Sequence, residues 1–335
     1  MKPNGISQSQ YFKFNLYLIL EHFIGIKLSK KLLHPLRRRL FEDVLKNENI
    51  EHRGKVLQNE DVICDDLEKV ILDKDLLLKG PLLFKGAAKD WTCTQKWNKE
   101  YFREHFHHHQ VSLVGNVGLA DKENQNKYTN TNLKTFIDEL GKDKNNYLRF
   151  ARFIDEDPEL RKDINVSWLE RFKSKFARGG YFYLFMGEEG SKTDMHNAII
   201  QSLFIQVKGK KKWTIYEPNE RIFLNTLADR RPYFYTEANP NVLDDPEFPL
   251  LKYPIRYEII LDEGDVLWFP SFYWHHVQNL TENIGVTYKF TEFEKSFRVS
   301  KVLSTLFFLA TKPTLIQSMY YNIFKKRDLL FEENH

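Results

Sequence analysis

Residues 181–290 contain a series of short apolar runs separated by turn-forming residues, and this pattern constrains the fold more than any other feature of the chain. The runs are rich in β-branched and aromatic residues, which favour strands. Many short antiparallel strands bury their apolar faces by closing into a sandwich or barrel, and the double-stranded β-helix (jelly-roll) is one such fold. The predicted strands are Tyr181–Met186, His196–Ile205, Lys212–Tyr216, Tyr257–Leu261, Val266–Phe269 and Gly285–Phe290.

Helical patterns flank this region, so we expect a mainly β protein with flanking α-helices. Residues 8–47 and the segment after residue 290 both show apolar residues at three- and four-residue steps. We divide the chain into a basic amphipathic helical N-terminal extension (1–58), a β-rich domain (59–290) and a C-terminal helical segment (291–335).

Positive charge is concentrated in the first fifty residues. They hold nine Lys/Arg and four Asp/Glu, so the other 285 residues together carry −1 of the net +4. The nearly neutral body gives no indication of nucleic-acid binding. The N-terminal helix either packs on the body with a solvated basic face, or lies as an amphipathic helix on an anionic membrane surface.

Targeting and redox signals are sparse. Charged residues such as Lys13, Glu21 and Lys27 interrupt the apolar stretch near the N-terminus, so we expect neither a signal peptide nor a transmembrane helix. Two cysteines, Cys64 and Cys93, are too few for a disulfide scaffold. We expect a cytoplasmic protein, with peripheral contact at the inner membrane face as the variant that residues 1–50 suggest.

Two histidines far apart in the sequence are candidates for one metal site. A mononuclear iron(II) site for oxygen chemistry is usually held by two His and one carboxylate, with positions left open. His196 begins a predicted strand, and His275 lies 79 residues later, shortly after the predicted strand Val266–Phe269. Lys211, on the strand after His196, can point inward by alternation and pair with a carboxylate of a dicarboxylic cosubstrate.

These residues resemble those of the Jumonji-C and cupin-like hydroxylases, which are iron(II)/2-oxoglutarate oxygenases. The similarity lies in Thr193, His196 and Lys211, in the later run Trp274-His275-His276-Val277, and in the opening segment 81–91 (PLLFKGAAKDW). It covers roughly residues 60–290. It implies a double-stranded β-helix core with flanking helices, and a C-terminal helical segment that often dimerises.

The resemblance also implies roles for single residues. The metal histidines fall on His196 and His275, with His276 the less favoured choice for the second. The cosubstrate-binding groups fall on Lys211, Thr193, Ser202 and, by a loose alignment, Tyr147. Lys289 stands where several relatives have Asn on the last core strand.

The chain departs from the family pattern at the carboxylate ligand. The pattern is His-x-Asp/Glu, whereas this chain has His196-Asn197-Ala198. Chloride or water could fill the vacant position, Asp194 could substitute from i−2 on the same strand face, or the site could be inactive or metal-poor.

Three functional hypotheses follow from this departure. The first is a hydroxylase-type iron(II)/2-oxoglutarate oxygenase acting on an unidentified protein or small molecule. The second is a non-catalytic cupin-like binding or scaffold protein. The third is a halogenase-like use of the vacant position.

Overall fold

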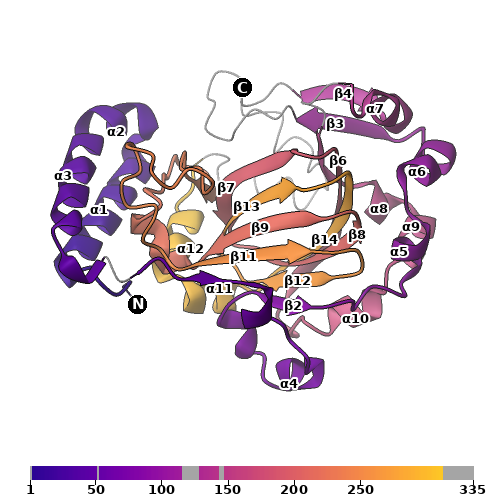
Figure 1. Ribbon diagram of the computed structural model, residues 1–335, viewed down its shortest axis with the longest axis horizontal. Helices are drawn as coiled ribbons and strands as arrows, with labels where there is room; N and C mark the ends of the chain where they lie inside the picture. Colours follow the sequence, from indigo (N-terminus) through magenta and orange to yellow (C-terminus); the bar gives the residue numbers. More distant parts are fainter. Residues whose placement is uncertain (1, 51–52, 115–127, 143–146, 312–335) are drawn as a thin grey trace.

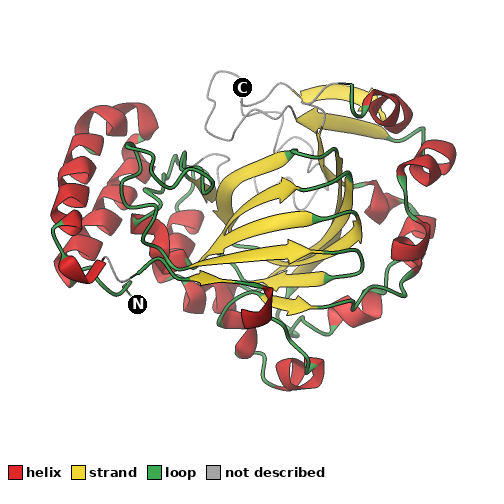
Figure 2. Ribbon diagram, viewed as in Figure 1, coloured by secondary structure: helices red, strands yellow, loops and turns green. Residues whose placement is uncertain are grey.

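The centre of the molecule is a pair of β-sheets that pack face to face (Figure 2). The structure is a computed structural model that describes residues 2–50, 53–114, 128–142 and 147–311. Consecutive strands alternate between the two sheets from β6 to β9 and again from β11 to β14. This alternation is the winding of a double-stranded β-helix, so the predicted jelly-roll fold is confirmed.

The smaller sheet has six strands within the described residues, in the order β1-β11-β9-β13-β7-β10 (Figure 1). Its neighbours are antiparallel except for β1 and β11. The strands are β1 (Val56–Leu57), β7 (Lys192–Ala198), β9 (Lys211–Tyr216), β10 (Tyr233–Tyr235), β11 (Arg256–Leu261) and β13 (Trp274–Asn279).

The larger sheet has eight strands among the residues described, in the order β2-β12-β8-β14-β6-β5-β3-β4, all antiparallel. They are β2 (Leu82–Phe84), β3 (Gln110–Val114), β4 (Tyr128–Asn132), β5 (Tyr147–Ala151), β6 (Arg178–Gly187), β8 (Gln201–Lys208), β12 (Val266–Phe269) and β14 (Asn283–Thr291).

One predicted strand is wrong. The apolar run His196–Ile205 is not a single strand, because β7 ends at Ala198 and β8 begins at Gln201 in the opposite sheet. Ile199 and Ile200 form the turn between the two strands. Because both residues are apolar, the hydropathy pattern does not indicate that the strand ends there.

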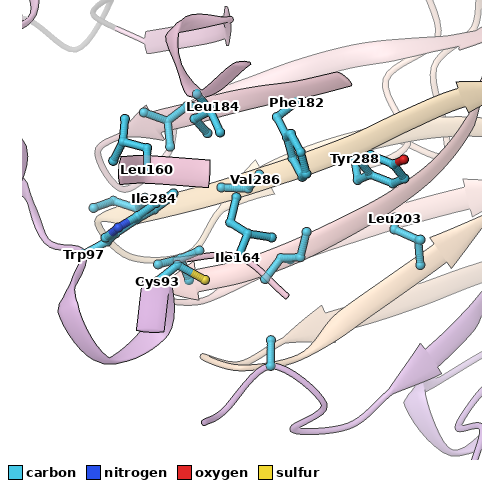
Figure 3. Close-up of a cluster of buried hydrophobic side chains, with 14 of the residues drawn as sticks. Cys93, Trp97, Leu160, Ile164, Phe182, Leu184, Leu203, Ile284, Val286 and Tyr288 are labelled. Atoms are coloured by element: carbon cyan, nitrogen blue, oxygen red, sulfur yellow. The ribbon is translucent and has the colours of Figure 1, made fainter. Parts of the chain in front are cut away.

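The larger sheet is apolar on both faces, since one face lines the interior and the other is covered by helices. Phe182 and Leu184 pack in the outer cluster (Figure 3), whereas Phe185, between Leu184 and Met186 on β6, faces the interior. The alternation follows from the two-residue period of a strand. The covering helices are α5 (Thr92–Lys96), α6 (Lys99–His105), α7 (Leu133–Glu139), α8 (Phe153–Glu156), α9 (Pro158–Lys162) and α10 (Val166–Glu170).

Both ends of the described chain are helical. The predicted helical stretch 8–47 is confirmed, but it is divided into three helices, and Gly25, with φ of 78°, separates the first two. The N-terminal helices are α1 (Gln8–Ile24), α2 (Ile26–Leu32) and α3 (His34–Leu45). Three further helices belong neither to this group nor to the helices that cover the larger sheet: α4 (Leu67–Leu72), α11 (Phe293–Val299) and α12 (Lys301–Phe308). Residues 312–335 of the predicted C-terminal helical segment lie outside the described residues. No helix in the described part of the chain is long and apolar enough to cross a membrane.

A buried ion pair joins α1 to α3 and to the body. The Arg37 guanidinium lies 2.9 Å from the Glu21 carboxylate, and both side chains are almost fully buried. Glu21 also accepts hydrogen bonds from Ser29 and from the Ala228 backbone. Although burial raises the pKa of Glu21, its hydrogen bonds and the charge of Arg37 hold that pKa below its usual value.

We expect Arg37→Met to lower the free energy of unfolding by about 3–5 kcal/mol, because it leaves Glu21 buried without its main counter-charge. Arg38→Met is the matched control, since Arg38 is exposed and its removal should change stability by less than about 0.5 kcal/mol. Urea titrations of both variants measure the difference. Equal effects would contradict a structural role for this pair.

Candidate functional site

A cavity opens between the two sheets. Aromatic rings form much of its wall, and no Asp or Glu is among the described residues that line it. The polar side chains that line it are Tyr147, Thr193, His196, Lys211, His275, Thr287 and Lys289.

The two predicted histidines face this cavity side by side. His196 on β7 and His275 on β13 are direct cross-strand partners, and their ring centroids are 4.3 Å apart. The Nδ1 atoms contact the backbone carbonyls of Asp194 at 2.8 Å and Tyr273 at 3.0 Å. Because a carbonyl only accepts hydrogen bonds, each Nδ1 carries the proton, and each Nε2 keeps a free lone pair.

Burial keeps both imidazoles neutral. It lowers the pKa of His196 to about 4 and that of His275 well below its usual value, and the nearby Lys289 ammonium acts in the same direction. A neutral ring whose Nδ1–H is bound to a carbonyl is the form in which histidine binds a metal. The pair therefore has the protonation and orientation of metal ligands.

A β-bulge explains how Thr193 and His196, three residues apart, reach the same cavity. His196 pairs with His275 and Thr193 pairs with Val277, so two residues of β7 oppose only His276. A regular strand would place Thr193 and His196 on opposite faces.

The bulge also determines where Asp194 lies. The expectation that Asp194 shares a face with His196 assumed regular alternation, which the bulge interrupts. Asp194 does not line the cavity, and its carboxylate instead acts electrostatically on His276. No group of three His, Cys, Asp or Glu side chains able to hold a metal occurs within the described residues.

Lys211 points into the cavity, as the alternation along β9 predicts. Its side chain is buried, whereas the neighbours Lys210 and Lys212 form ion pairs with Asp262 and Glu258. Burial lowers the pKa of the Lys211 ammonium to about 7.

The Lys211 ammonium belongs to a group of three polar side chains. Its Nζ lies 3.3 Å from the Tyr147 hydroxyl, which also forms a side-chain hydrogen bond with Thr193. Tyr147 and Thr193 come from different sheets, so the fold brings three of the four predicted cosubstrate residues together.

Two other predicted positions lie outside the cavity lining. Ser202 is buried on β8 beside Phe269 and Lys289, but it does not line the cavity. Ala198 ends β7 opposite Tyr233 and contributes only a methyl group where a ligand carboxylate was expected.

Several lining residues, Thr287 and Phe150 among them, were not assigned a role from the sequence. Thr287 shares the inward face of β14 with Lys289, two positions on, and the same alternation that placed Lys211 could have identified it. Phe150 could not be found this way, because it lies at a register shift in β5 and has φ of 61°.

Comparison with known proteins agrees with this geometry. The profile of the cupin-like domain matches residues 71–296, which is more than half of the chain. The chain belongs to the cupin-like domain family. The family assignment confirms the resemblance to Jumonji-C and cupin-like proteins that the site motifs indicated.

Relatives of this cupin-like chain include named oxygenases and demethylases. Lysine-specific demethylase 8 of Xenopus tropicalis is 24% identical over 67% of this chain and 51% of its own length. The 2-oxoglutarate and iron-dependent oxygenase JMJD4 of Danio rerio is 25% identical over 64% and 56%. The tRNA wybutosine-synthesizing protein 5 of Homo sapiens is 25% identical over 62% and 69%. The chain spans about half the length of the first curated relatives it matches.

Proposed function

We propose that this protein is an iron(II)- and 2-oxoglutarate-dependent oxygenase of the hydroxylase type. The observation that carries the proposal is the convergence of His196, His275 and Lys211 on one cavity between the sheets. Relatives named as 2-oxoglutarate and iron-dependent oxygenases support this assignment.

The residues present fit both groups, with one protein ligand fewer than usual. His196 and His275 would hold the metal through Nε2, because each Nδ1 is bound to a backbone carbonyl. Lys211, Tyr147 and Thr193 would bind the far carboxylate of 2-oxoglutarate by charge and hydrogen bonds. Ala198 supplies no ligand, so water or an anion such as chloride would complete the coordination.

Iron(II) and 2-oxoglutarate, when bound, would supply the oxidative chemistry with O2 as the oxidant: one oxygen atom would enter succinate as CO2 is lost, and the other would hydroxylate the substrate. The protein's own residues hold, orient and desolvate these groups. The rings of Phe204, Trp213 and Phe269 line the cavity around His275 and Lys211, so they exclude bulk water from it.

We expect the protein to bind iron(II) and 2-oxoglutarate under anaerobic conditions, with a weak visible charge-transfer band, and to form succinate when oxygen is admitted. The reason is the cavity's combination of two neutral imidazoles with one ammonium. Anaerobic absorption spectroscopy and succinate detection test this. Absence of both signals from folded protein would refute the oxygenase proposal.

A non-catalytic binding protein is the second candidate, and the absence of an acidic side chain from the described cavity lining favours it. In that case 2-oxoglutarate or another anion binds without turnover. A halogenase-like variant differs from both, because its product formation would depend on chloride. Omitting chloride from the succinate assay separates these alternatives.

We propose that the substrate is a protein or a small molecule. The relatives' names include a lysine demethylase and a tRNA-modifying protein, and those activities belong to those proteins. The nearly neutral body of this chain favours a protein or small-molecule substrate over a nucleic acid.

A further inference from the structure

A second ammonium group, that of Lys289, faces the cavity beside the histidine pair. Lys289 lies on β14 and lines the same cavity as His196 and His275. Its Nζ lies 5.2 Å from the ring centroids of Phe150 and Tyr183. None of the ion pairs found among the described residues includes Lys289.

The cavity wall beside Lys289 includes a residue with an unusual backbone conformation. Phe150 adopts φ of 61°, a left-handed conformation that is strained for a residue with a side chain. This conformation occurs at a register shift between Leu148 and Ala151, where a regular β5 would continue its ladder to β6. Phe150 thereby lines the cavity at cation–π distance from Lys289.

The described lining of the cavity offers Lys289 no acidic partner. If the proposed function holds, the charges of iron(II) and the 2-oxoglutarate dianion cancel, and Lys211 faces the far carboxylate of the cosubstrate. Lys289 is then the lining ammonium that neither group neutralises. An uncompensated buried charge is costly, so the site gains most from a ligand that brings negative charge to Lys289.

We infer that Lys289 recognises an anionic oxygen group on the substrate, a carboxylate or a phosphate, which enters the cavity that Lys289 lines together with His196 and His275. This inference rests on the proposed function, and it narrows the substrate to anionic molecules or to acidic or phosphorylated side chains. Lys211 binds the cosubstrate and Lys289 binds the substrate, from opposite sheets of the core.

The test is calorimetric titration of the metal-free protein with acetate, inorganic phosphate and chloride, with and without saturating 2-oxoglutarate. We expect acetate or phosphate to bind the wild type, and Lys289→Met to weaken that binding at least about tenfold, as expected for the loss of one charged partner. Lys289→Arg should restore most of the affinity, and Lys210→Met, at an exposed position, should not change it. The oxyanion that binds more tightly indicates the substrate class.

Two results would overturn the inference: oxyanion binding that Lys289→Met leaves unchanged, or binding of chloride alone. Thermal unfolding of each variant separates lost binding from lost folding. If 2-oxoglutarate fails to bind while phosphate or acetate still requires Lys289, the proposed function fails and the anion site stands. If 2-oxoglutarate binds and Lys289→Met leaves oxyanion binding unchanged, the anion site at Lys289 fails and the proposed function stands.

An independent observation concerns the outer face of α1. Its inner face is buried on the body through Tyr11, Phe14 and Leu18, as expected of a surface helix. The outer face is also apolar: Phe12, Leu16, Leu20 and Phe23 are 65%, 40%, 40% and 53% exposed and lie at helical spacing on one stripe. The exposed Leu28 and Leu32 on α2 extend the apolar surface.

The charges on the N-terminal helices favour an anionic partner. Exposed basic residues lie on α1 (Lys13), α2 (Lys27 and Lys31) and α3 (Arg38 and Arg39), within a segment of nine Lys/Arg and four Asp/Glu. Apolar side chains with surrounding cations fit an anionic bilayer surface, where both contribute to binding. We propose that the outer face of α1 and α2 docks on anionic membranes without crossing them.

Flotation of the full-length protein with phosphatidylserine-containing and with pure phosphatidylcholine vesicles tests this docking. We expect flotation with the anionic vesicles only, and its loss in Phe12→Asp/Phe23→Asp and in Lys27→Glu/Lys31→Glu. Leu72→Asp is the matched control, because Leu72 is 87% exposed on α4, outside the docking face. Absence of flotation would overturn the proposal. Concentration-dependent self-association that the Phe12→Asp/Phe23→Asp variant abolishes would also overturn it, because it would show that a second copy of the protein covers this face.

Discussion

His275→Ala is expected to abolish the charge-transfer band of the iron(II)/2-oxoglutarate complex and to weaken metal binding by at least about 100-fold. Loss of a residue that only orients a metal ligand already costs 10- to 100-fold, and removal of a ligand with no acidic partner to compensate should cost more. Anaerobic titration with iron(II), or with cobalt(II) as a spectroscopic substitute, measures the change.

The adjacent histidine provides the control for this experiment. His276 is as buried as a core residue but does not line the cavity, and burial lowers its pKa to about 4. His276→Asn should therefore cost stability while metal affinity stays within a few-fold of wild type. If His276→Asn removes the metal and His275→Ala retains it, the assignment of the second ligand is reversed.

The double-stranded β-helix fold could be predicted from the sequence, because the series of strand patterns indicates it even where the ends of single strands are misplaced. Five of the six predicted strands between residues 181 and 290 match single strands to within a few residues at each end, and Val266–Phe269 matches β12 at both ends. The same two-residue alternation placed Lys211 inside and Lys210 and Lys212 outside. The corner at residues 199–200 was missed because a turn between two interior-facing strands can itself be apolar.

The details of the site did not follow, because they arise from departures from regular strand geometry. The bulge at residues 194–195 depends on pairing between β7 and β13, which hydropathy along one strand does not encode. Because of this bulge, Thr193 lines the cavity together with His196, and Asp194 does not. The left-handed conformation of Phe150 has the same origin, since register between β5 and β6 is a tertiary property. A role for Lys289 could not be predicted either, because it depends on which other side chains line the cavity, and none of the described ones is acidic.

Lys211→Met is expected to raise the dissociation constant of 2-oxoglutarate by about 30- to 1000-fold, which corresponds to the loss of 2–4 kcal/mol from one partner of a buried charge pair. The methionine side chain keeps most of the apolar contact with Phe204 and removes only the charge. Calorimetric titration with 2-oxoglutarate measures the effect, and Lys210→Met is the control on the same strand. An unchanged affinity would show that the cosubstrate does not use this ammonium.

The same substitution should stabilise the ligand-free protein, because it removes an ammonium that is buried beside aromatic rings and has the Tyr147 hydroxyl as its hydrogen-bond partner in the described part of the chain. Burial lowers the pKa of Lys211 from 10.5 to about 7, so between these values the unfolded chain binds a proton that the folded protein lacks. Folding of the wild type therefore becomes more favourable as the pH rises through this window, and the penalty is largest below pH 7. We expect the melting temperature of Lys211→Met to exceed that of the wild type most at pH 6–7 and the difference to shrink towards pH 9. Thermal unfolding across this range measures it, and a difference that grows with pH would contradict a buried, charge-penalised Lys211.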